Sequence, residues 1–543
     1  MSEVVARPAR EAGPSPDGGR RELARSGAVS LVGSLVAAVG GFALTIVVGR
    51  LFGAHTAGLY FQAVAVFMIL NGVALAGSDT GIVRALSARL ALGRPDRARL
   101  ALRLTLTPVL LWSVVVAATL AVLVDDLAAT FPAADRQVVT AYLWVLVGTL
   151  VVSACGQAAL NGTRSLGTVG PFVGLYQVAL PLTRLLAVGA LWWTDAPAGW
   201  LLLSYAVPLV LMDAAAVAIL VRALRRRDAA SPDRSAAPEP SRADEARELW
   251  GFNLPRGVAS CLELGLVWAD VIIVGILLGP AAAGAWAAAS RFVTTGTMAM
   301  EALRLQSAPA MASAWARGDR RGLGEVYGVT AVWLVLASWP LFLLLATHAP
   351  LVLALVGPEF TVAATPLSVM ALGMLGYVAL GNVNAALLMA GRSVATARNT
   401  GVALAVNIGL NLLLVPALGL LGAAVAWAVA LTLDSLLCLL RSGVDLPLVL
   451  PGRQLLAAGG AALLAFGVPG VAVRVLAAPT AGWLLAHVAV GAVVYAALLA
   501  ALRRRLELDR LDLAPALRRL VPHRRRPSTD PTTDPTSHPG RNP

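Results

Sequence analysis

Long apolar runs fill most of this sequence and alternate with short polar segments. The pattern predicts about fourteen transmembrane helices, because each crossing of a bilayer needs roughly 20 apolar residues. We expect these helices at 27–48, 57–78, 102–124, 138–160, 171–193, 199–221, 255–278, 281–303, 327–347, 361–388, 398–415, 419–440, 454–473 and 481–501. The predicted fold class is therefore an all-α polytopic membrane protein, with two pseudo-symmetric six-helix lobes and a C-terminal helix pair.

Three polar segments divide the apolar runs. Residues 222–250 contain proline and charges of both signs, which is typical of a flexible linker, and both ends of the chain are polar and rich in arginine. We expect a disordered tail at 1–25, an N-lobe of helices 1–6 at 26–222, a linker at 223–250, a C-lobe of helices 7–12 at 251–441, two further helices at 442–501, and a second tail at 502–543.

Composition supports a membrane protein and excludes several kinds of chemistry. Of 543 residues, 58% are hydrophobic and 13% are charged, whereas soluble domains carry about 25% charged residues. The sequence contains no lysine, so all 43 residues counted as Lys+Arg are arginine. A Walker A loop and a Schiff-base cofactor both need lysine and are excluded. The three cysteines and five histidines show no metal-ligand spacing. We expect no cofactor, no metal and no catalytic residue.

Arginine is unevenly distributed and indicates orientation. It concentrates in both tails, in the linker and in alternate loops, whereas the other loops carry acids such as Asp125, Asp126, Asp195 and Glu359. Loops rich in arginine stay on the cytoplasmic side of a membrane. We therefore expect both termini and the linker to be cytoplasmic, with an even number of spans between the termini.

An internal repeat is the strongest motif in the sequence. The segment GRLFGAHTAGLY at 49–60 aligns with GILLGPAAAGAW at 275–286, and each copy lies between two predicted spans. Small residues let helices approach closely, and repeats of one topology are a transporter architecture with the substrate between the halves. Three glycines of the first copy align with three of the second: Gly49, Gly53 and Gly58 with Gly275, Gly279 and Gly284.

Charged side chains inside the predicted spans are candidates for a functional site, because each costs about 2.5–3.5 kcal/mol at mid-helix. Arg184, near the middle of its span, and Arg291 are the candidate substrate-binding residues. Asp270 and Arg291 lie at one depth on neighbouring spans, so we expect them to pair unless Arg291 binds substrate. The remaining charges are candidate coupling residues or structural ion pairs: Asp213, Arg256, Glu263, Asp270, Glu301 and Arg304.

Amide side chains also recur inside the spans, four residues apart. Gln157 and Asn161 form one such pair, and Asn407 and Asn411 form another. We expect both pairs to make hydrogen bonds between helices, because polar groups in lipid are satisfied by neighbouring helices.

Three segments carry a resemblance to a known family: GRLFGAHTAGLYFQAVAVFMIL, WADVIIVGILLGPAAAGAWAAASRF and the stretch from VGPEFTVAATPLSVMAL to NIGLNLLLVPALGLLGAAVAWAVA. They resemble the polysaccharide (O-antigen, Wzx-type) flippase branch of the multidrug/oligosaccharidyl-lipid/polysaccharide (MOP) exporter superfamily. The resemblance covers about residues 26–441. Lipid II flippases also have fourteen spans, but their signature around the second helix is not found here.

The resemblance implies two lobes around a central, often cationic cavity. It implies a transporter rather than an enzyme, which moves a polyprenyl-diphosphate-linked saccharide from the cytoplasmic to the outer leaflet by alternating access, for cell-surface polysaccharide biosynthesis. The implied location is the bacterial cytoplasmic membrane. The implied partners are the lipid-linked saccharide, membrane lipids, and a polysaccharide polymerase or glycosyltransferases, with no nucleic acid.

Two alternative functions remain open at this point. A drug/cation antiporter of the same superfamily would need an acidic cavity, whereas Arg184 and Arg291 make this interior at least as basic as acidic. A polytopic membrane glycosyltransferase or polysaccharide polymerase would need a large outer loop to hold its sugar, and the predicted outer loops are short.

Overall fold

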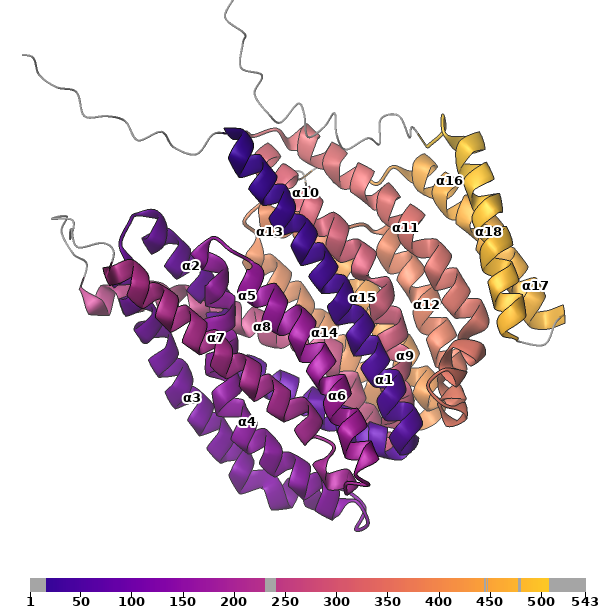
Figure 1. Cartoon of the computed structure of the whole chain (residues 1–543). Coiled ribbons are helices and arrows are strands. Elements are labelled where there is room, and N and C mark those ends of the chain that lie inside the picture. The colour runs from indigo at the N-terminus through magenta and orange to yellow at the C-terminus, as the bar shows by residue number, and fades with distance from the viewer. Residues whose placement is uncertain (1–15, 230–240, 444–445, 447, 477–479, 507–543) are drawn as a thin grey trace, which may run out of the picture.

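The computed structural model describes residues 16–229, 241–443, 446, 448–476 and 480–506, and every regular element among them is a helix (Figure 1). Within this part, twelve helices are long and apolar enough to cross a membrane. One of them, Val32–Leu75, has 44 residues and is bent at Gly53, where φ is 75°. The non-helical backbone at Gly53 divides this element into the first two predicted spans. The all-α polytopic fold is confirmed.

The N-lobe is organised around α4, which packs on α7, α3, α1 and α2. Its elements are α1 (Pro16–Leu75), α2 (Ser78–Ala91), α3 (Pro95–Ala129), α4 (Arg136–Thr163), η1 (Arg164–Leu166), α5 (Gly170–Phe172), η2 (Val173–Ala179), α6 (Leu180–Trp193), η3 (Ala198–Trp200) and α7 (Leu203–Ala229). The helix α1 also packs extensively against α9 and α8, so it joins this lobe to the next.

The C-lobe follows, and its long helices α11, α12, α14 and α15 pack on one another in pairs. Its elements are α8 (Arg242–Leu278), α9 (Pro280–Gly296), α10 (Met298–Ala316), α11 (Arg320–Ala354), η4 (Pro358–Ala363), α12 (Ala364–Ala379), α13 (Val383–Met389), α14 (Ser393–Leu418) and α15 (Leu420–Ser442). A buried apolar cluster runs through both lobes and includes Tyr60, Trp286 and Phe342.

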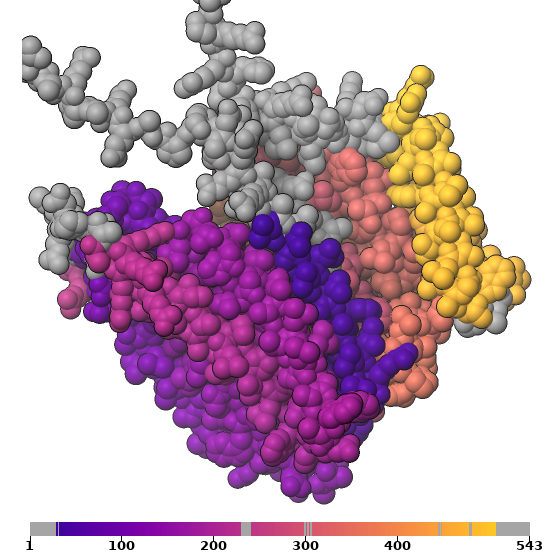
Figure 2. All heavy atoms as spheres, viewed as in Figure 1, coloured from indigo at the N-terminus to yellow at the C-terminus, as the bar shows by residue number. Residues whose placement is uncertain are grey.

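The last helices lie at the edge of the molecule. They are α16 (Gly452–Ala462), η5 (Leu463–Gly467), α17 (Val468–Leu476) and α18 (Ala481–Leu502). They pack on α11, and Figure 2 shows them in yellow beside the C-lobe, with α1 in indigo along the boundary of the N-lobe.

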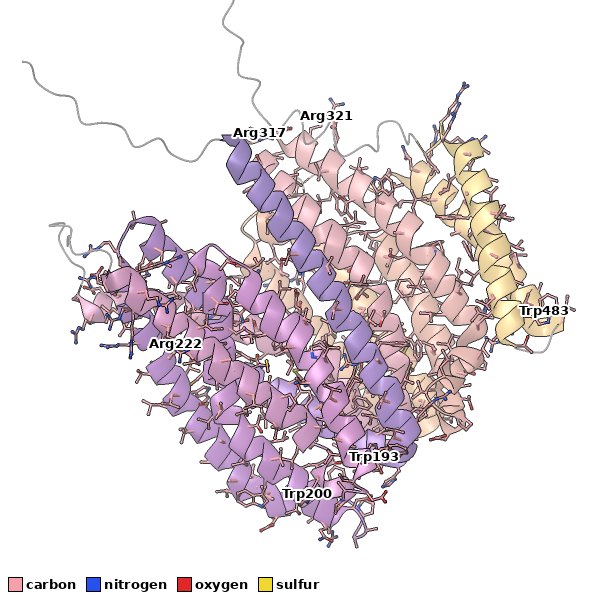
Figure 3. All side chains as sticks on the ribbon, viewed as in Figure 1. Trp193, Trp200, Arg222, Arg317, Arg321 and Trp483 are labelled. Atoms are coloured by element: carbon pink, nitrogen blue, oxygen red, sulfur yellow. The ribbon has the colours of Figure 1, made fainter. Side chains whose placement is uncertain are left out.

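The two ends of the bundle differ in their side chains. Arg317 and Arg321 lie at the end where α1 begins, and Trp193 and Trp200 lie at the opposite end (Figure 3). We call these ends the arginine side and the hairpin side, since Gly53 and Gly279 turn the chain at the second. Tryptophan is enriched where a helix leaves a membrane, which agrees with helices that span from one side to the other.

The second helix of each lobe is broken. In the N-lobe the break falls at Ala76 and Gly77, which have φ values of 45° and 78° and separate α1 from α2. In the C-lobe it falls at Thr297, between α9 and α10. The sequence predicts one continuous span over 281–303, so this expectation is wrong. Broken helices in transporters free backbone groups and often line the substrate site.

The segment expected as a linker is partly helical. Residues 223–229 continue α7 and 242–250 form the first turns of α8, while 230–240 lie outside the described residues. Residues 16–25 likewise belong to α1. The start of α8 is anchored on the N-lobe, because the buried Glu245 carboxylate lies 3.4 Å from Arg97 and 3.9 Å from Arg89, and the Trp250 indole donates to the Leu104 carbonyl.

We predict that Glu245→Ala destabilises the junction between the lobes. The substitution leaves the positive charges of Arg89 and Arg97 without the carboxylate that compensates them. Breaking a buried ion pair in this way costs about 3–5 kcal/mol. Thermal unfolding in detergent should show a lower midpoint. The matched control is Glu248→Ala, three residues further along the same helix and exposed, which should leave the midpoint unchanged. Equal midpoints for the two variants would contradict the anchoring role of Glu245.

Candidate functional site

Arg184 lies on α6 among aromatic side chains rather than carboxylates. Its guanidinium carbon Cζ is 3.6 Å from the centre of the Tyr205 ring on α7. Its Nε is buried without a hydrogen-bond partner, and no ion pair of Arg184 occurs among the described residues. Stacking on a ring face compensates part of the lost hydration of a cation. Arg184 therefore retains an uncompensated positive charge and hydrogen-bond donors for a ligand.

The ring that holds Arg184 belongs to an aromatic cluster between α1 and α7, made of Tyr60, Phe61, Phe67 and Tyr205. The Tyr205 ring centre is 6.4 Å from that of Tyr60 and 5.6 Å from that of Phe67, both in edge-to-face geometry. Tyr60 and Phe61 are themselves 5.2 Å apart. Such contacts fix each ring in place. The aromatic cluster is thus a rigid support for the Arg184 side chain.

Arg291 approaches the same region from the C-lobe. It lies on α9, with its Cζ 4.8 Å from the centre of the Trp268 ring on α8. The charges of Arg184 and Arg291 both act on the Tyr60 hydroxyl, and the two guanidinium charges also act on each other. The fold therefore brings together two basic side chains that are far apart in the sequence, one from each lobe.

A cavity of about 290 Å³ adjoins Arg291. Its walls come from α8, α9, α10, α12 and α15 of the C-lobe, and Phe61 of α1 is the contribution of the N-lobe. Arg291 and Trp268 both line it. The cavity therefore adjoins the aromatic cluster through Phe61.

Asp270 does not pair with Arg291 as the sequence led us to expect. The Asn411 amide of α14 donates a hydrogen bond of 2.7 Å to the Asp270 carboxylate, while Arg291 stacks on Trp268. Asp270 is 1% exposed. Counting residues along two helices gives their relative depth but not the direction in which each side chain points. Here Asp270 points toward α14, so it joins two helices of the C-lobe and leaves Arg291 available.

Asp213 is the buried acid of the N-lobe. It is 0% exposed, and both carboxylate oxygens lack a hydrogen-bond partner. Asp213 packs closely on α4, because a Cβ added to Gly156 of that helix would lie 2.1 Å from the Asp213 Cβ. The charge of Arg184 acts on Asp213, but the two form no ion pair. Asp213 is therefore not an ion-pair partner of Arg184 in this structure.

The remaining charged candidates lie apart from the two arginines. Arg256 and Glu263 form a bidentate ion pair on α8, with N–O distances of 3.1 and 3.3 Å. The Glu301 side chain lies outside the described residues, so its pairing with Arg304 stays a prediction.

The amide pairs behave differently from each other. On α4, the Gln157 amide donates to the Ser153 hydroxyl and the Asn161 amide donates to the Gln157 carbonyl, so both bonds stay within one helix. The expectation of interhelical bonds is wrong for this pair, since both partners lie one turn away on the same helix. It holds for Asn411, which bonds to Asp270 across helices.

The repeated glycines form the turns on the hairpin side. Gly53 and its aligned partner Gly279 have φ values of 75° and 91°, with ψ values of 170° and 171°. These positive φ values favour glycine, which has no Cβ to clash with the backbone. The two copies of the repeat therefore share one backbone conformation as well as a sequence pattern.

The next glycines of the repeat touch across the lobe boundary. A Cβ added to Gly58 would lie 1.7 Å from the Pro280 carbonyl oxygen, and one added to Gly284 would lie 2.3 Å from the Ala54 carbonyl oxygen. Ala54 and Pro280 occupy equivalent positions in the two copies of the repeat. Gly58 of the first copy therefore contacts Pro280 of the second, and Gly284 of the second copy contacts Ala54 of the first. This reciprocity indicates a pseudo-twofold axis. Gly49 and Gly275 also pack tightly, against Val356 and Gln62.

Sequence reasoning missed the aromatic partners of the two arginines. Tyr60 was visible only as the end of the first repeat copy, aligned with Trp286, and nothing in the local sequence of Tyr205 or Trp268 points to a basic partner. Aromatic residues are only 6% of the chain. The sequence therefore offered only two signals for these aromatic residues: the scarcity of aromatic residues in the chain and, for Tyr60, its place in the repeat.

A family model matches part of the C-lobe. The MatE family model matches residues 255–413. The matched region includes Asp270, Arg291 and Asn411, and it spans most of the helices that line the cavity. No curated protein matches the chain by sequence.

Solved structures show the same fold over most of the chain. The lipid II flippase MurJ, in an inward closed conformation, has a TM-score of 0.68 and 13% identity, over 88% of this chain and 98% of that one. An inward-facing multidrug resistance MATE family transporter of the MOP superfamily has a TM-score of 0.58 and 13% identity, over 76% of this chain and 97% of that one. A MOP superfamily transporter from Pyrococcus furiosus, described by the reverse polarity of its binding pocket, has a TM-score of 0.53 and 14% identity, over 78% of this chain and 94% of that one. The protein thus has the fold of MOP superfamily transporters and is a multi-pass membrane protein.

Proposed function

We propose that this protein is a flippase, which moves a polyprenyl-diphosphate-linked saccharide across the membrane by alternating access. One observation carries the proposal: Arg184 and Arg291, from opposite lobes, are close enough for their charges to act on each other and on Tyr60. Each stacks on an aromatic ring, Tyr205 or Trp268, and neither is in an ion pair among the described residues. Two guanidinium groups match the roughly two negative charges of a diphosphate. Each presents a planar fork of donors that fits phosphate oxygens.

The low dielectric of the site strengthens this argument. An anion that crosses a bilayer must leave water, and its charge must be balanced along the path. Arg184 and Arg291 stack on aromatic rings, and this cation–π attraction is about 0.5–2 kcal/mol. A guanidinium therefore dissociates from a ring more readily than it would from a carboxylate. The arginines can therefore exchange their rings for a diphosphate without leaving an uncompensated acid behind.

The orientation and setting that we propose follow from the arginine distribution. The arginine side faces the cytoplasm, with both termini and the segment 230–240 there, and the hairpin side faces outward. The membrane is the bacterial cytoplasmic membrane, and the transported saccharide serves cell-surface polysaccharide biosynthesis. A polymerase or glycosyltransferases would supply or consume the lipid-linked saccharide on either side.

A drug/cation antiporter is the second candidate. The observation that favours it is the pair of buried carboxylates, Asp213 and Asp270, neither of which is in an ion pair in the described structure. Carboxylates of this kind attract cations. The two arginines oppose it, because the cavity wall carries Arg291 and would repel a cationic drug. An enzymatic function has no support from the family or the solved neighbours, which are transporters.

Reconstituted proteoliposomes distinguish the two functions. We expect the protein to move a fluorescent polyprenyl-diphosphate-linked sugar between leaflets, measured as the fraction that an external quencher reaches with time. A fluorescent phosphatidylcholine is the control and should not move faster than in empty liposomes. Proton-driven ethidium accumulation without movement of the diphosphate probe would refute the flippase and support the antiporter.

A further inference from the structure

The cavity beside Arg291 has walls of two chemical kinds. One kind is aromatic: Trp268, Tyr377 and Trp427 come from three different helices of the C-lobe. The other kind is a row of hydroxyls along the end of α9: Ser290, Thr294 and Thr297. A volume of about 290 Å³ is at the small end of ligand pockets, which run from about 300 to 1,000 Å³. The cavity therefore suits one compact ring with both an apolar face and polar edges.

The hydroxyls are arranged to accept hydrogen bonds. Ser290 donates its proton to the Ala287 carbonyl at 3.0 Å, Thr294 to the Arg291 carbonyl at 3.2 Å, and Thr297 to the Thr294 carbonyl at 2.7 Å. With its proton committed to the backbone, each oxygen offers lone pairs to a ligand. The row therefore fits a ligand rich in hydroxyl donors, while Arg291 on the same wall supplies donors for an acceptor.

Helical spacing places this row in the cavity. Ser290, Thr294 and Thr297 lie at positions i, i+4 and i+7, which fall on one face of a helix. Thr297 is the junction of α9 and α10, and both Thr294 and Thr297 line the cavity at that junction. Packing around the junction is close, because a Cβ added to Gly296 would lie 2.6 Å from the Phe342 ring. The site is thus part of the region that the MatE family model matches.

We infer that this cavity binds one sugar ring of the lipid-linked saccharide, the ring attached directly to the diphosphate. The inference rests on the proposed function and deepens it. A pyranose has an apolar C–H face that packs on an aromatic ring and a rim of hydroxyls, which matches Trp268 and Trp427 on one side and the hydroxyl row on the other. Arg291, on the wall of the cavity, contacts the first phosphate.

Two other occupants fit the walls less well. A polyprenyl chain has no hydrogen-bonding groups, so it would leave the Arg291 donors desolvated, which costs free energy, and would not use the lone pairs of Ser290 and Thr294. A cationic aromatic compound would stack on the tryptophans but would meet the positive charge of Arg291. Only a ligand that joins a polyol ring to an anion uses both kinds of wall and the arginine.

Binding of short-chain probes to the full-length protein in nanodiscs tests the inference. The probes are farnesyl diphosphate and its conjugates with glucose, galactose and N-acetylglucosamine. We expect at least one conjugate to bind roughly tenfold more tightly than farnesyl diphosphate, as expected for one aromatic stacking contact. Trp427→Ala should abolish this difference while leaving the affinity for farnesyl diphosphate unchanged. Trp144→Ala, on a tryptophan that is 54% exposed outside the cavity, is the matched control and should change neither affinity.

Each failure has a separate meaning. If farnesyl diphosphate and all conjugates bind equally to the unmodified protein, the sugar site is refuted but the flippase is not. If Trp427→Ala weakens farnesyl diphosphate as much as the conjugates, the cavity holds the lipid and the inference is again overturned. If no diphosphate binds at all, the proposed function fails. Should Trp427→Ala not fold, Thr294→Val decides: it removes one acceptor at constant shape and must weaken only the conjugates.

Discussion

Arg184→Ala slows flipping of the lipid-linked saccharide severely but leaves the protein folded. A hydrogen bond to a charged group contributes about 1.5–3 kcal/mol, so we expect a rate roughly 10- to 150-fold lower in proteoliposomes. Stability should change little, because Arg184 leaves no ion-pair partner behind and only its stacking on Tyr205 is lost. Arg184→Gln should behave in the same way, since the charge matters more than the size of the side chain.

The control variants separate a substrate role from a structural one. Arg222→Ala removes an exposed arginine from the same lobe (Figure 3) and should flip the probe at the normal rate. The double variant Arg184→Ala with Asp213→Ala should remain inactive, because the two side chains form no ion pair whose loss needs correction. Normal flipping by Arg184→Ala, or rescue by the double variant, would contradict the substrate role.

Gly58→Ala prevents the two hairpins from closing on each other. The new methyl carbon would lie 1.7 Å from the Pro280 carbonyl oxygen, far inside contact distance, so α1 and α9 must separate. Overpacking costs about 1–3 kcal/mol. A cost of that size shifts the balance between closed and open hairpin sides by roughly 5- to 150-fold. We expect flipping to fall by a similar factor, since alternating access needs both states.

Hydrogen exchange at the hairpins shows whether the mechanism is correct. Residues 49–60 and 275–286 should exchange faster in Gly58→Ala, and Gly284→Ala should reproduce the effect from the other lobe, because the contact is reciprocal. Gly41→Ala is the matched control on the same helix: nothing lies within 4 Å of its added Cβ, and alanine favours a helix by about 0.5–1 kcal/mol. Slower flipping without faster exchange at the hairpins would contradict a closing role for Gly58.

The fold class was accessible from the sequence because lipid imposes strict conditions on it. Backbone groups in a bilayer must bond within their own helix, so long apolar runs can only be helices. The same reasoning located Arg184 and Arg291 as exceptional, since a charge inside a span is costly. It also located Gly53 and Gly279, whose positive φ values only glycine adopts readily.

The breaks inside helices were not accessible in this way. The run 281–303 is mainly apolar despite Arg291 and Glu301 and reads as one span, yet the helix ends at Gly296 and starts again at Met298. The contact of Gly296 with Phe342, a residue of another helix, accompanies this break. A break that depends on packing between helices leaves no mark in local hydropathy.

By itself, the sequence determined the all-α membrane fold, the approximate limits of most helices, the repeated hairpins and the two unusual arginines. Only the tertiary structure decided the partners of those arginines. Asp270 and Arg291 were expected to pair because their depths match, but depth is one coordinate and rotation about the helix axis is another. That rotation turns Asp270 to Asn411 and Arg291 to Trp268. It is set by the packing of whole helices, which no local pattern of residues records.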